Sequence, residues 1–409
     1  MRLTRHIPLL FAISSSLGYE LLREYAGTNF FNGWDWFGSW DNLTLGDVNW
    51  LSEADAMAQN LAYINSAGNA IIKVDNTTNV PLNEKRNTVR ITTTDFYSVG
   101  TLWLISLRHI PFGCSVWPAF WSKGTLWPND GEIDIIEAIN LMDHNQMALH
   151  TTAGCTHESI GNNFQKGNNI DTNCGTGSGC TVAETEPDSF AEGFADNGGG
   201  VWATQFDVSG IFIWFWPRPS VPSSITQLSS TQTSLDISTW GPPSASYPSG
   251  PSCNITNFFT PQQLVLDITL CGDWAGTQSA YTNSACGKQG PTGICYNDAV
   301  VGSGANYANA YFEIEWLRTF TNNPSDLPSS SPTTDSGVAI PTGATSESSS
   351  QGGSPVVVVT STVVAGANPS GDPITGNGVK GQIGNGCLGH GRLGGRMLRM
   401  LSIVVVYIP

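Results

Sequence analysis

Charged side chains are scarce in this sequence, and positive ones are scarcer than negative ones. Charged residues make up 12% of the 409 positions, and 33 Asp and Glu against 17 Lys and Arg give a formal net charge of −16. A protein that binds nucleic acid needs a basic surface to face the phosphate backbone, so this balance excludes nucleic acid as an expected partner. An acidic surface instead suits a neutral polysaccharide or an acidic medium.

The sequence also lacks an apolar run long enough to span a membrane. The apolar stretch at the C-terminal end, residues 396–409, is short and contains Arg399. A spanning helix needs about 20 apolar residues. A lipid-anchor signal would need a longer apolar tail after a polar spacer. An unstructured C-terminal tail is therefore the favoured interpretation of residues 396–409, and a lipid anchor is the weaker alternative. We therefore expect no membrane span.

Metal-binding patterns are absent as well. No Cys-x-x-Cys pair and no calcium-loop spacing occurs, so we expect no metal site and no cofactor. Of the nine cysteines, eight lie between Cys114 and Cys295, and the ninth is Cys387. Eight cysteines in one region predict four disulfides formed in an oxidising compartment, with free buried thiols as the alternative. Their pairing cannot be deduced, because eight cysteines allow 105 connectivities.

Residues 1–18 have the order of a secretory signal. Arg2 and Arg5 precede a short apolar run, residues 7–13, and small residues follow it. Export is also indicated by Asn-x-Ser/Thr sequons, although such sequons are common by chance. They begin at Asn42, Asn76 and Asn254. We expect a secreted, extracellular protein.

Residues 19–321 have the pattern of an all-β domain. The chain contains 45 Gly and 14 Trp, and many short segments rich in β-branched or aromatic residues are bounded by Gly, Pro, Asn or Ser. Long helices are rare, and Glu53 to Tyr63 is the best candidate. The spacing of the segments predicts a β-sandwich without internal repeats. The clearest predicted strands are residues 70–74, 98–105, 210–216, 263–269 and 310–316.

The composition changes at Asn322. Pro, Ser, Thr and Gly dominate to about Gly378, interrupted by the valine-rich stretch 356–360. A Ser/Thr/Pro-rich segment of this kind cannot bury enough apolar surface to fold. Residues 322–409 are therefore predicted to be a disordered tail, open to O-glycosylation.

One stretch, residues 128–140, places acids among isoleucines. Glu132, Asp134 and Glu137 alternate with Ile133, Ile135 and Ile136. Acids are rarely buried unless they are paired or functional. The β-branched residues favour a strand, because at helical pitch Glu132 and Glu137 would lie about 140° apart and the apolar residues would form no stripe. An amphipathic helix with solvated acids is the weaker alternative.

The spacing of these acids predicts an irregularity in the strand. With a period of two, Glu132 and Asp134 share one face, whereas Glu137 points to the other. A β-bulge at Ile135 and Ile136 would return Glu137 to the face of Glu132. The acids would then line one cleft, and two carboxyl groups flanking one bond are what glycoside hydrolysis requires. An ordinary cluster of surface acids is the alternative.

The stretch from Gly131 to Glu137 resembles the catalytic signature of glycoside hydrolase family 16, in the bulged form of laminarinases and endo-1,3(4)-β-glucanases. The resemblance covers about residues 19–320 and is greatest to fungal secreted members. Further matching segments are residues 117–121, 145–150, 154–155, 197–202 and 271–276. The family implies a β-jelly-roll sandwich of the concanavalin A-like class with a concave substrate cleft.

The resemblance also implies catalytic roles. Glu132 aligns with the nucleophile, which must be ionised to attack the anomeric carbon. Glu137 aligns with the acid/base, whose pKa must be raised by burial and a nearby anion. Asp134 is expected to hydrogen-bond and hold the nucleophile. The implied bulged geometry predicts retention of anomeric configuration. One departure from the family pattern is Asp130, which stands where Asn or Gly is expected and would either raise the neighbouring pKa values or face solvent.

Aromatic residues near the acids are candidates for sugar binding, because Trp combines apolar area with a polar handle. Trp117 and Trp121 lie four residues apart and so would share a strand face. Matches to family positions favour the cleft for at least one of these two, and for His150 beside the nucleophile. Trp274 resembles another cleft residue of the family. Each could instead be structural, since Trp is usually largely buried and an isolated His usually satisfies a local contact.

These patterns lead to one main functional hypothesis. We expect a secreted, monomeric endo-β-glucanase that cuts internal β-1,3 and also β-1,4 linkages of β-glucans, with association with the cell wall left open. A cell-wall β-glucan transglycosylase is the alternative enzyme, because a sugar hydroxyl can replace water in the second step. A glucan-binding protein without catalysis is the third hypothesis, against which the intact Glu132 and Glu137 argue.

Overall fold

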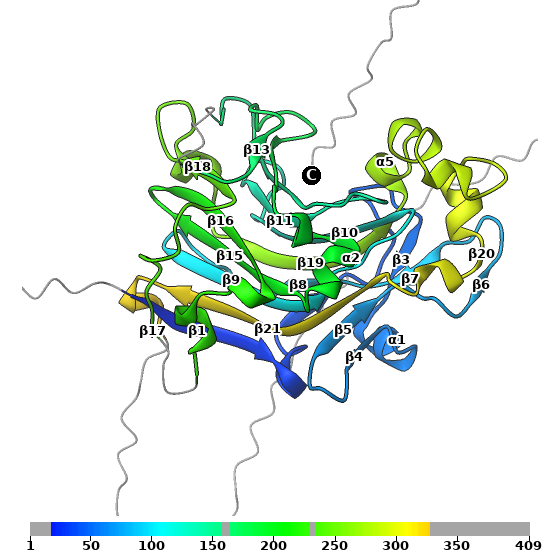
Figure 1. The fold of residues 1–409 in the computed structure, drawn as a ribbon, viewed down its shortest axis with the longest axis horizontal. Helices are drawn as coiled ribbons and strands as arrows, with labels where there is room; N and C mark the ends of the chain where they lie inside the picture. Colours follow the sequence, from blue (N-terminus) through cyan, green and yellow to red (C-terminus); the bar gives the residue numbers. More distant parts are fainter. Residues whose placement is uncertain (1–17, 158–163, 230–233, 328–409) are drawn as a thin grey trace, which may run out of the picture. The chain divides into compact units, whose positions relative to one another are not determined.

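The computed structural model describes residues 18–157, 164–229 and 234–327. These residues form two large antiparallel sheets packed around a hydrophobic core (Figure 1). The predicted all-β sandwich is therefore confirmed. Residues 1–17 of the predicted signal and residues 328–409 of the predicted tail lie outside the described residues.

The first sheet has eight strands and carries the acidic stretch near its centre. Its strand β11 (Glu132–Glu137) lies between β12 (Gln146–His150) and β10 (Val116–Lys123). On the β12 side the sheet continues through β14 (Cys180–Ala183) to β13 (Asn168–Asn169). On the β10 side it continues through β19 (Gln263–Leu270) and β8 (Arg90–Thr93) to β2 (Trp34–Trp36).

The second sheet has nine strands and forms the other layer of the sandwich. Its central strands are β9 (Thr101–His109), β21 (Tyr311–Thr321) and β15 (Gly200–Asp207). The remaining strands are β1 (Tyr19–Ala26), β17 (Ser234–Leu235), β16 (Gly210–Pro217), β18 (Ala245–Pro248), β5 (Ala70–Lys73) and β4 (Ala62–Ile64).

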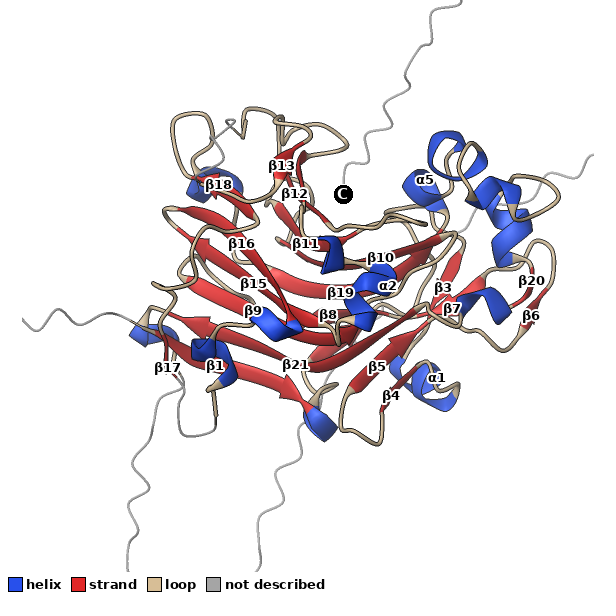
Figure 2. Ribbon diagram, viewed as in Figure 1, coloured by secondary structure: helices blue, strands red, loops and turns tan. Residues whose placement is uncertain are grey.

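The other elements are short and lie mainly in the connections between strands (Figure 2). Two small sheets pair β20 (Gly302–Ser303) with β6 (Asn79–Val80), and β3 (Val48–Trp50) with β7 (Arg86–Thr88). The α helices are α1 (Glu53–Ala58), α2 (Ala191–Asp196), α3 (Ser223–Thr226), α4 (Ile255–Phe258) and α5 (Gly272–Ala275). None of the helices within the described ranges is long and apolar enough to cross a membrane.

The helix expected from Glu53 to Tyr63 is shorter than predicted. Helix α1 ends at Ala58, and Asn60 adopts a left-handed conformation with a φ of 55°. A left-handed residue cannot continue a right-handed helix. Strand β4 then begins at Ala62, and Tyr63 pairs with Ile71 of β5. Tertiary pairing therefore overrides the local helical pattern.

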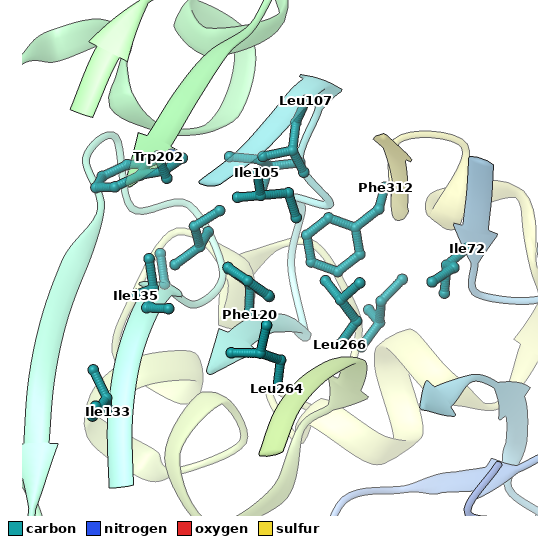
Figure 3. Close-up of a cluster of buried hydrophobic side chains, with 14 of the residues drawn as sticks. Ile72, Ile105, Leu107, Phe120, Ile133, Ile135, Trp202, Leu264, Leu266 and Phe312 are labelled. Atoms are coloured by element: carbon teal, nitrogen blue, oxygen red, sulfur yellow. The ribbon is translucent and has the colours of Figure 1, made fainter. Parts of the chain in front are cut away.

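The core between the sheets follows from the alternation of side chains along each strand. On β10, Phe120 points into the core, whereas Trp117 and Trp121 point to the outer face, where they line the cleft described below. Ile133 and Ile135 of β11 enter the same core. Figure 3 shows them packed with side chains of both sheets, among them Ile105, Trp202, Leu264, Leu266 and Phe312.

The outer face of the nine-stranded sheet carries a second hydrophobic cluster. Trp214 and Trp216 of β16 pack there against Trp240, whose ring meets theirs edge-on at centroid distances of 5.4 and 4.9 Å. Trp240 belongs to the segment between β16 and β18, which also contributes Ile225 and Leu235 to this cluster. This face of the sandwich is therefore covered.

Four disulfides join the eight cysteines of the domain, which confirms that prediction and supplies the pairing that the sequence left open. The pairs are Cys114–Cys286, Cys155–Cys253, Cys174–Cys180 and Cys271–Cys295. Cys271 immediately precedes α5 and Cys295 follows it, so their disulfide closes the segment that carries α5.

Candidate active site

Strand β11 contains the predicted bulge. Phe120 of β10 pairs with Ile136, and the next residue, Trp121, pairs with Asp134. Ile135 is therefore the extra residue with no partner opposite. The pairing with β12 shifts at the same place, between Asp134 and Glu137.

The bulge sorts the side chains as the sequence pattern requires. Ile135 and Ile136 are both fully buried in the core, although they are consecutive. Glu132, Asp134 and Glu137 consequently share the outer face and line one cleft. A regular strand of the same length would have sent Glu137 into the core.

Asn145 stabilises the bulge from the neighbouring connection. Its side-chain Oδ1 accepts a hydrogen bond from the Glu137 backbone N–H at 2.9 Å, and its Nδ2 donates to the Ile135 carbonyl at 2.8 Å. Asn145 is fully buried. Backbone groups that a bulge removes from the ladder need such partners. The sequence marks Asn145 only as part of a family motif, because this contact exists only once the strand is bulged.

The cleft has a volume of about 630 Å³ and crosses the outer face of the eight-stranded sheet. All of the predicted site residues line it: Glu132, Asp134, Glu137, Trp117, Trp121, His150 and Trp274. Residues that the sequence analysis did not assign to the site also line it, among them Trp127, Arg90, Gln146, Asp171, Ser178, Thr181, Asp267, Thr269, Asp273, Leu43 and Thr44.

Glu132 lies at the start of β11, opposite His150 of β12. Its Oε2 accepts a hydrogen bond from the Trp127 indole N–H, and its carboxyl group also hydrogen-bonds Asp134. Burial, reinforced by the charge of Asp134, raises the pKa of Glu132 to about 8. Trp127 is 47% exposed and lies on the loop before β11. A loop has no periodic pattern of side chains, so the sequence does not predict that Trp127 faces the cleft.

Asp134 is the buried acid in the middle. Its Oδ2 lies 3.2 Å from His150 Nε2. The structure thus brings the His150 side chain to Asp134, while its backbone pairs with Glu132, beside which it was expected. Burial, with a smaller contribution from the charge of Asp267, raises the pKa of Asp134 to about 7 despite the hydrogen bond with Glu132. Glu132 and Asp134 therefore retain protons well above the pH at which isolated carboxyl groups lose them.

Glu137 lies at the end of β11. Its Oε1 accepts a hydrogen bond of 2.8 Å from the Trp117 indole N–H. Burial raises the pKa of Glu137 well above its ordinary value, and the charge of Asp134 adds to the effect. A carboxyl group in this state is a proton donor at neutral pH.

Trp117 and Trp121 are both largely buried, and both also line the cleft. The structural role and the cleft role that were considered as alternatives are therefore combined in each residue. Trp117 meets Trp274 edge-on at 5.4 Å, with Trp274 presented by α5. The Trp121 indole N–H donates to Asp267 Oδ2 at 3.1 Å, and Arg90 Nε lies 3.9 Å from the same oxygen. Burial raises the pKa of Asp267 to about 6, and Arg90 opposes that shift.

Asp130 is placed away from the acids. Its Oδ2 accepts a hydrogen bond of 2.8 Å from the Leu126 backbone N–H, so it closes the loop that carries Trp127. Gly131 follows with a φ of 80°, and an added Cβ there would collide with the Phe259 ring. The local turn therefore requires glycine at 131 and gives Asp130 a structural contact.

Glu132, Asp134 and His150 could also be considered as ligands of a cation. Their donor atoms lie within 4.8 Å of one another. The hydrogen bond between the two carboxyl groups gives another account of the cluster, because a proton can hold two acids together as a cation would. The arrangement thus fits carboxyl chemistry without a metal.

The comparison with protein families agrees with this geometry. A family model described as "XgeA-like, catalytic GH16 domain" matches residues 34–320. A "Probable glycosidase" of Schizosaccharomyces pombe is 36% identical over 308 residues, which are 74% of this chain and 69% of that protein. The endo-1,3(4)-β-glucanase xgeA of Emericella nidulans is 32% identical over 309 residues, or 74% of this chain and 47% of that protein.

Two solved structures are similar over the same region. Laminarinase 16A of Phanerochaete chrysosporium, solved with β-glucans in donor and acceptor sites, has a TM-score of 0.67 and 32% identity, covering 74% of this chain and 99% of that one. An elongating β-1,3-glucosyltransferase of the same family has a TM-score of 0.66 and 35% identity, covering 74% and 100%.

These matches define the chain as a jelly-roll glycoside hydrolase, which confirms the predicted fold and enzyme class. It belongs to glycoside hydrolase family 16. The chain covers only 40% to 47% of the length of the glucanases of Aspergillus niger and Emericella nidulans that it matches.

Proposed function

We propose that this protein hydrolyses internal β-1,3 and also β-1,4 glucosidic bonds of β-glucans by a retaining double displacement. The observation that carries the proposal is the bulged strand β11, which brings Glu132 and Glu137 to one face with an indole N–H on each carboxyl group. The names of similar proteins, endo-1,3(4)-β-glucanase and laminarinase, support β-glucan as the substrate.

In the first step Glu132 attacks the anomeric carbon while Glu137 donates its proton to the leaving oxygen. The raised pKa of Glu137 keeps it protonated until the bond breaks. In the free site the proton between these two acids is favoured on Glu132, whose pKa is about 8 against about 7 for Asp134. For Glu132 to attack, that proton must pass to Asp134, which then donates a hydrogen bond to the anionic Glu132 and holds it in place.

In the second step water attacks the glycosyl-enzyme. Glycosylation discharges Glu132, so the pKa of Glu137 falls and its carboxylate accepts the proton of the incoming water. His150, beside Asp134, fixes that carboxyl group through the second step. Trp117, Trp121, Trp127 and Trp274 offer the sugar chain aromatic surfaces along the cleft.

Transglycosylation is the second candidate function. It is favoured by the similarity to the elongating glucosyltransferase, which is as close in identity as the glucanases are. The first step would be the same, and a sugar hydroxyl would replace water as the acceptor. The four disulfides of residues 114–295 support the proposal that either enzyme works outside the cell, as a secreted protein.

Proton NMR of the first product released from laminarin tests the mechanism. A retaining enzyme releases the β-anomer first, and we expect that result at early times. Early α-anomer would contradict the double displacement and the pairing of Glu132 with Glu137. Longer glucans formed together with the shorter fragments left by the donor, without a net gain in reducing ends, would replace hydrolysis by transglycosylation.

A further inference from the structure

We propose that Asn140, which does not line the cleft, is a positioning residue for the proton that Glu137 donates. It fixes the segment of α5, whose Trp274 holds the indole of Trp117 against the Glu137 carboxyl group. The inference rests on the proposed function, in which Glu137 protonates the leaving oxygen. Asn140 follows Glu137 by three residues in the chain and is 5% exposed.

Asn140 has a strained backbone conformation, and two other strained residues lie beside it. Its φ is 55°, and Ser115 and Cys271 have φ values of 74° and 59°. Residues other than glycine rarely adopt this left-handed region, although Asn tolerates it better than most. The Ser115 backbone N–H donates to Asn140 Oδ1 at 2.8 Å, and the Cys271 backbone N–H donates to the Ser115 carbonyl at 2.8 Å. Such strain persists only where the surrounding contacts enforce it, so the ends of β10, β11 and β19 are held in one arrangement here.

The side chain of Asn140 reaches the segment that carries Trp274. Its Nδ2 donates to the Ala275 carbonyl at 2.9 Å and to the Ala280 carbonyl at 3.1 Å. Ala275 is the last residue of α5 and directly follows Trp274. An amide has two N–H donors, and both are used here. Two hydrogen bonds from one rigid group therefore fix where α5 lies relative to the end of β11.

Trp274 completes a closed ring of contacts that returns to Glu137. The Trp274 ring meets the Trp117 ring edge-on at a centroid distance of 5.4 Å. Ala275 is fully buried in the same hydrophobic cluster as Trp117. The Trp117 indole N–H in turn donates to Glu137 Oε1 at 2.8 Å. A displacement of α5 caused by a change at Asn140 would therefore move Trp117 and loosen its hydrogen bond with Glu137.

The hydrogen bond from Trp117 decides which oxygen of Glu137 carries the proton. An indole N–H can only donate, so Oε1 must accept and the proton of the carboxyl group resides on Oε2. A general acid works only when its proton lies within hydrogen-bond reach of the leaving oxygen. If Trp117 moved away, the carboxyl group would be free to rotate and its proton would be divided between two positions. Asn140 thus acts on proton donation through α5 and Trp117, without contact with the sugar.

Asn140→Asp in the full-length protein tests the inference. The variant keeps the acceptor for Ser115, but an oxygen replaces the NH₂ group that faces the carbonyls of Ala275 and Ala280, and it repels them. We expect kcat/KM on laminarin to fall about tenfold, because the acid is misplaced. Asn60→Asp is the matched control. Asn60 has the same φ of 55° and is exposed after α1, so its variant adds the same charge and should match wild type.

A substrate with an activated leaving group separates proton donation from binding and folding. Dinitrophenyl β-laminaribioside releases a stable phenolate that needs no proton, so kcat/KM of Asn140→Asp on it should stay within about twofold of wild type. Asn140→Gly removes the same donors and suits the left-handed backbone, so it should show the same pattern if the Asp variant folds poorly. An equal loss on both substrates, or no loss on laminarin, would overturn the inference.

The indole N–H of Trp117 gives a readout that needs no substrate. In protein with isotope-labelled tryptophan, its NMR signal is assigned by its absence from Trp117→Phe. Exchange of this N–H with solvent should be about tenfold faster in Asn140→Asp, whereas the Trp214 N–H, bonded to the Gly241 carbonyl, should not change. If wild type cleaves neither substrate, the proposed function fails and this measurement still decides. Faster exchange at Trp117 alone supports the positioning role, whereas unchanged exchange there, or faster exchange at both indoles, rejects it.

Discussion

The two outer faces of the sandwich follow the same alternation of side chains and end in opposite states. On the nine-stranded sheet, part of the outward face is an apolar cluster, and a connecting segment covers it with Trp240. On the eight-stranded sheet the outward residues are acids and indoles, and they line an open cleft. The strand period alone therefore does not make a site. A site forms on the eight-stranded sheet because acids occupy outward positions there, whereas apolar residues at such positions on the other sheet are covered by a connecting segment.

The indoles on the two faces illustrate the difference. Trp214, on the covered face, donates its N–H to the Gly241 carbonyl at 3.0 Å, which satisfies a buried polar group. Trp117, on the open face, donates to Glu137, a group whose charge changes during the proposed reaction. The same side chain completes packing in one place and tunes an acid in the other.

Glu132→Gln should produce the largest change on the open face. Removal of the nucleophile is expected to lower kcat at least about 10³-fold, because the covalent step is lost. The melting temperature should stay the same or rise, since one buried acid is gone. Initial rates on laminarin and a thermal melt measure both effects. Glu24→Gln on β1 of the other sheet is the matched control and should retain full activity.

Trp240→Ala should produce the largest change on the covered face. We expect the free energy of unfolding to fall by about 3–5 kcal/mol, as for other large-to-small changes at buried aromatic positions. The kcat of the surviving folded enzyme should be within about twofold of wild type. Denaturant unfolding and rates at low temperature check both. A large loss of kcat without loss of stability would show that the two faces are not independent.

Trp127→Ala is the counterpart on the open face. Its ring is half exposed and its indole N–H donates to Glu132, so kcat/KM should fall about tenfold while stability changes by less than about 1 kcal/mol. Trp127→Phe, which keeps the ring and loses the donor, separates stacking from hydrogen bonding. Stability loss as large as that of Trp240→Ala would contradict the comparison.

The acids should make stability depend on pH. Glu132, Asp134 and Glu137 have folded-state pKa values raised above their ordinary values of 4.5, 3.8 and 4.5, to about 8 and about 7 for the first two. Their stabilisation is complete below pH 4 and is lost as the pH rises through the folded-state pKa values. Because one unit of pKa shift corresponds to about 1.4 kcal/mol, the free energy of unfolding should thus fall by several kcal/mol between about pH 4 and pH 8.

The measurement for this prediction is a series of thermal melts across that range. The difference between wild type and the double variant Glu132→Gln, Glu137→Gln isolates the contribution of the site from that of other titrating groups. A wild-type curve parallel to that of the double variant would mean that the acids are not protonated in the folded state.

A chelator should have the smallest effect. Because a shared proton accounts for the contact between Glu132 and Asp134, incubation with EDTA followed by dialysis is expected to leave activity on laminarin and the melting temperature unchanged. If activity were lost and then restored by an added divalent cation, Glu132, Asp134 and His150 would be ligands of a metal ion.

The sequence was most informative where a pattern is local. Consecutive buried isoleucines between acids at odd spacing predict the bulge, because no regular strand can satisfy them. Family motifs then add Trp117, Trp121, His150 and Trp274, all of which line the cleft.

Contacts between distant segments could not be predicted in the same way. Arg90 and Asp267 meet only because β8 and β19 are neighbours in the sheet, and Cys114 pairs with Cys286 across 172 residues. Trp127 lies on a loop without periodicity, and Asn145 binds backbone groups that exist only in the bulged strand. Helix α1 ended early because β4 competes for its last residues.

Ile135 has a further consequence for how such strands can diverge. Without it, the run from Glu132 to Glu137 would alternate regularly, and all the acids would still face outward, because a bulge inserts one residue into an otherwise regular ladder. Deletion of Ile135 would thus keep the outward acids outward and the inward isoleucines inward. It would keep the identity of both carboxylates and alter only the angle between them, since bulges bend and twist the strand that carries them. The extra isoleucine thus sets the angle between Glu132 and Glu137 without deciding which face of the sheet they occupy.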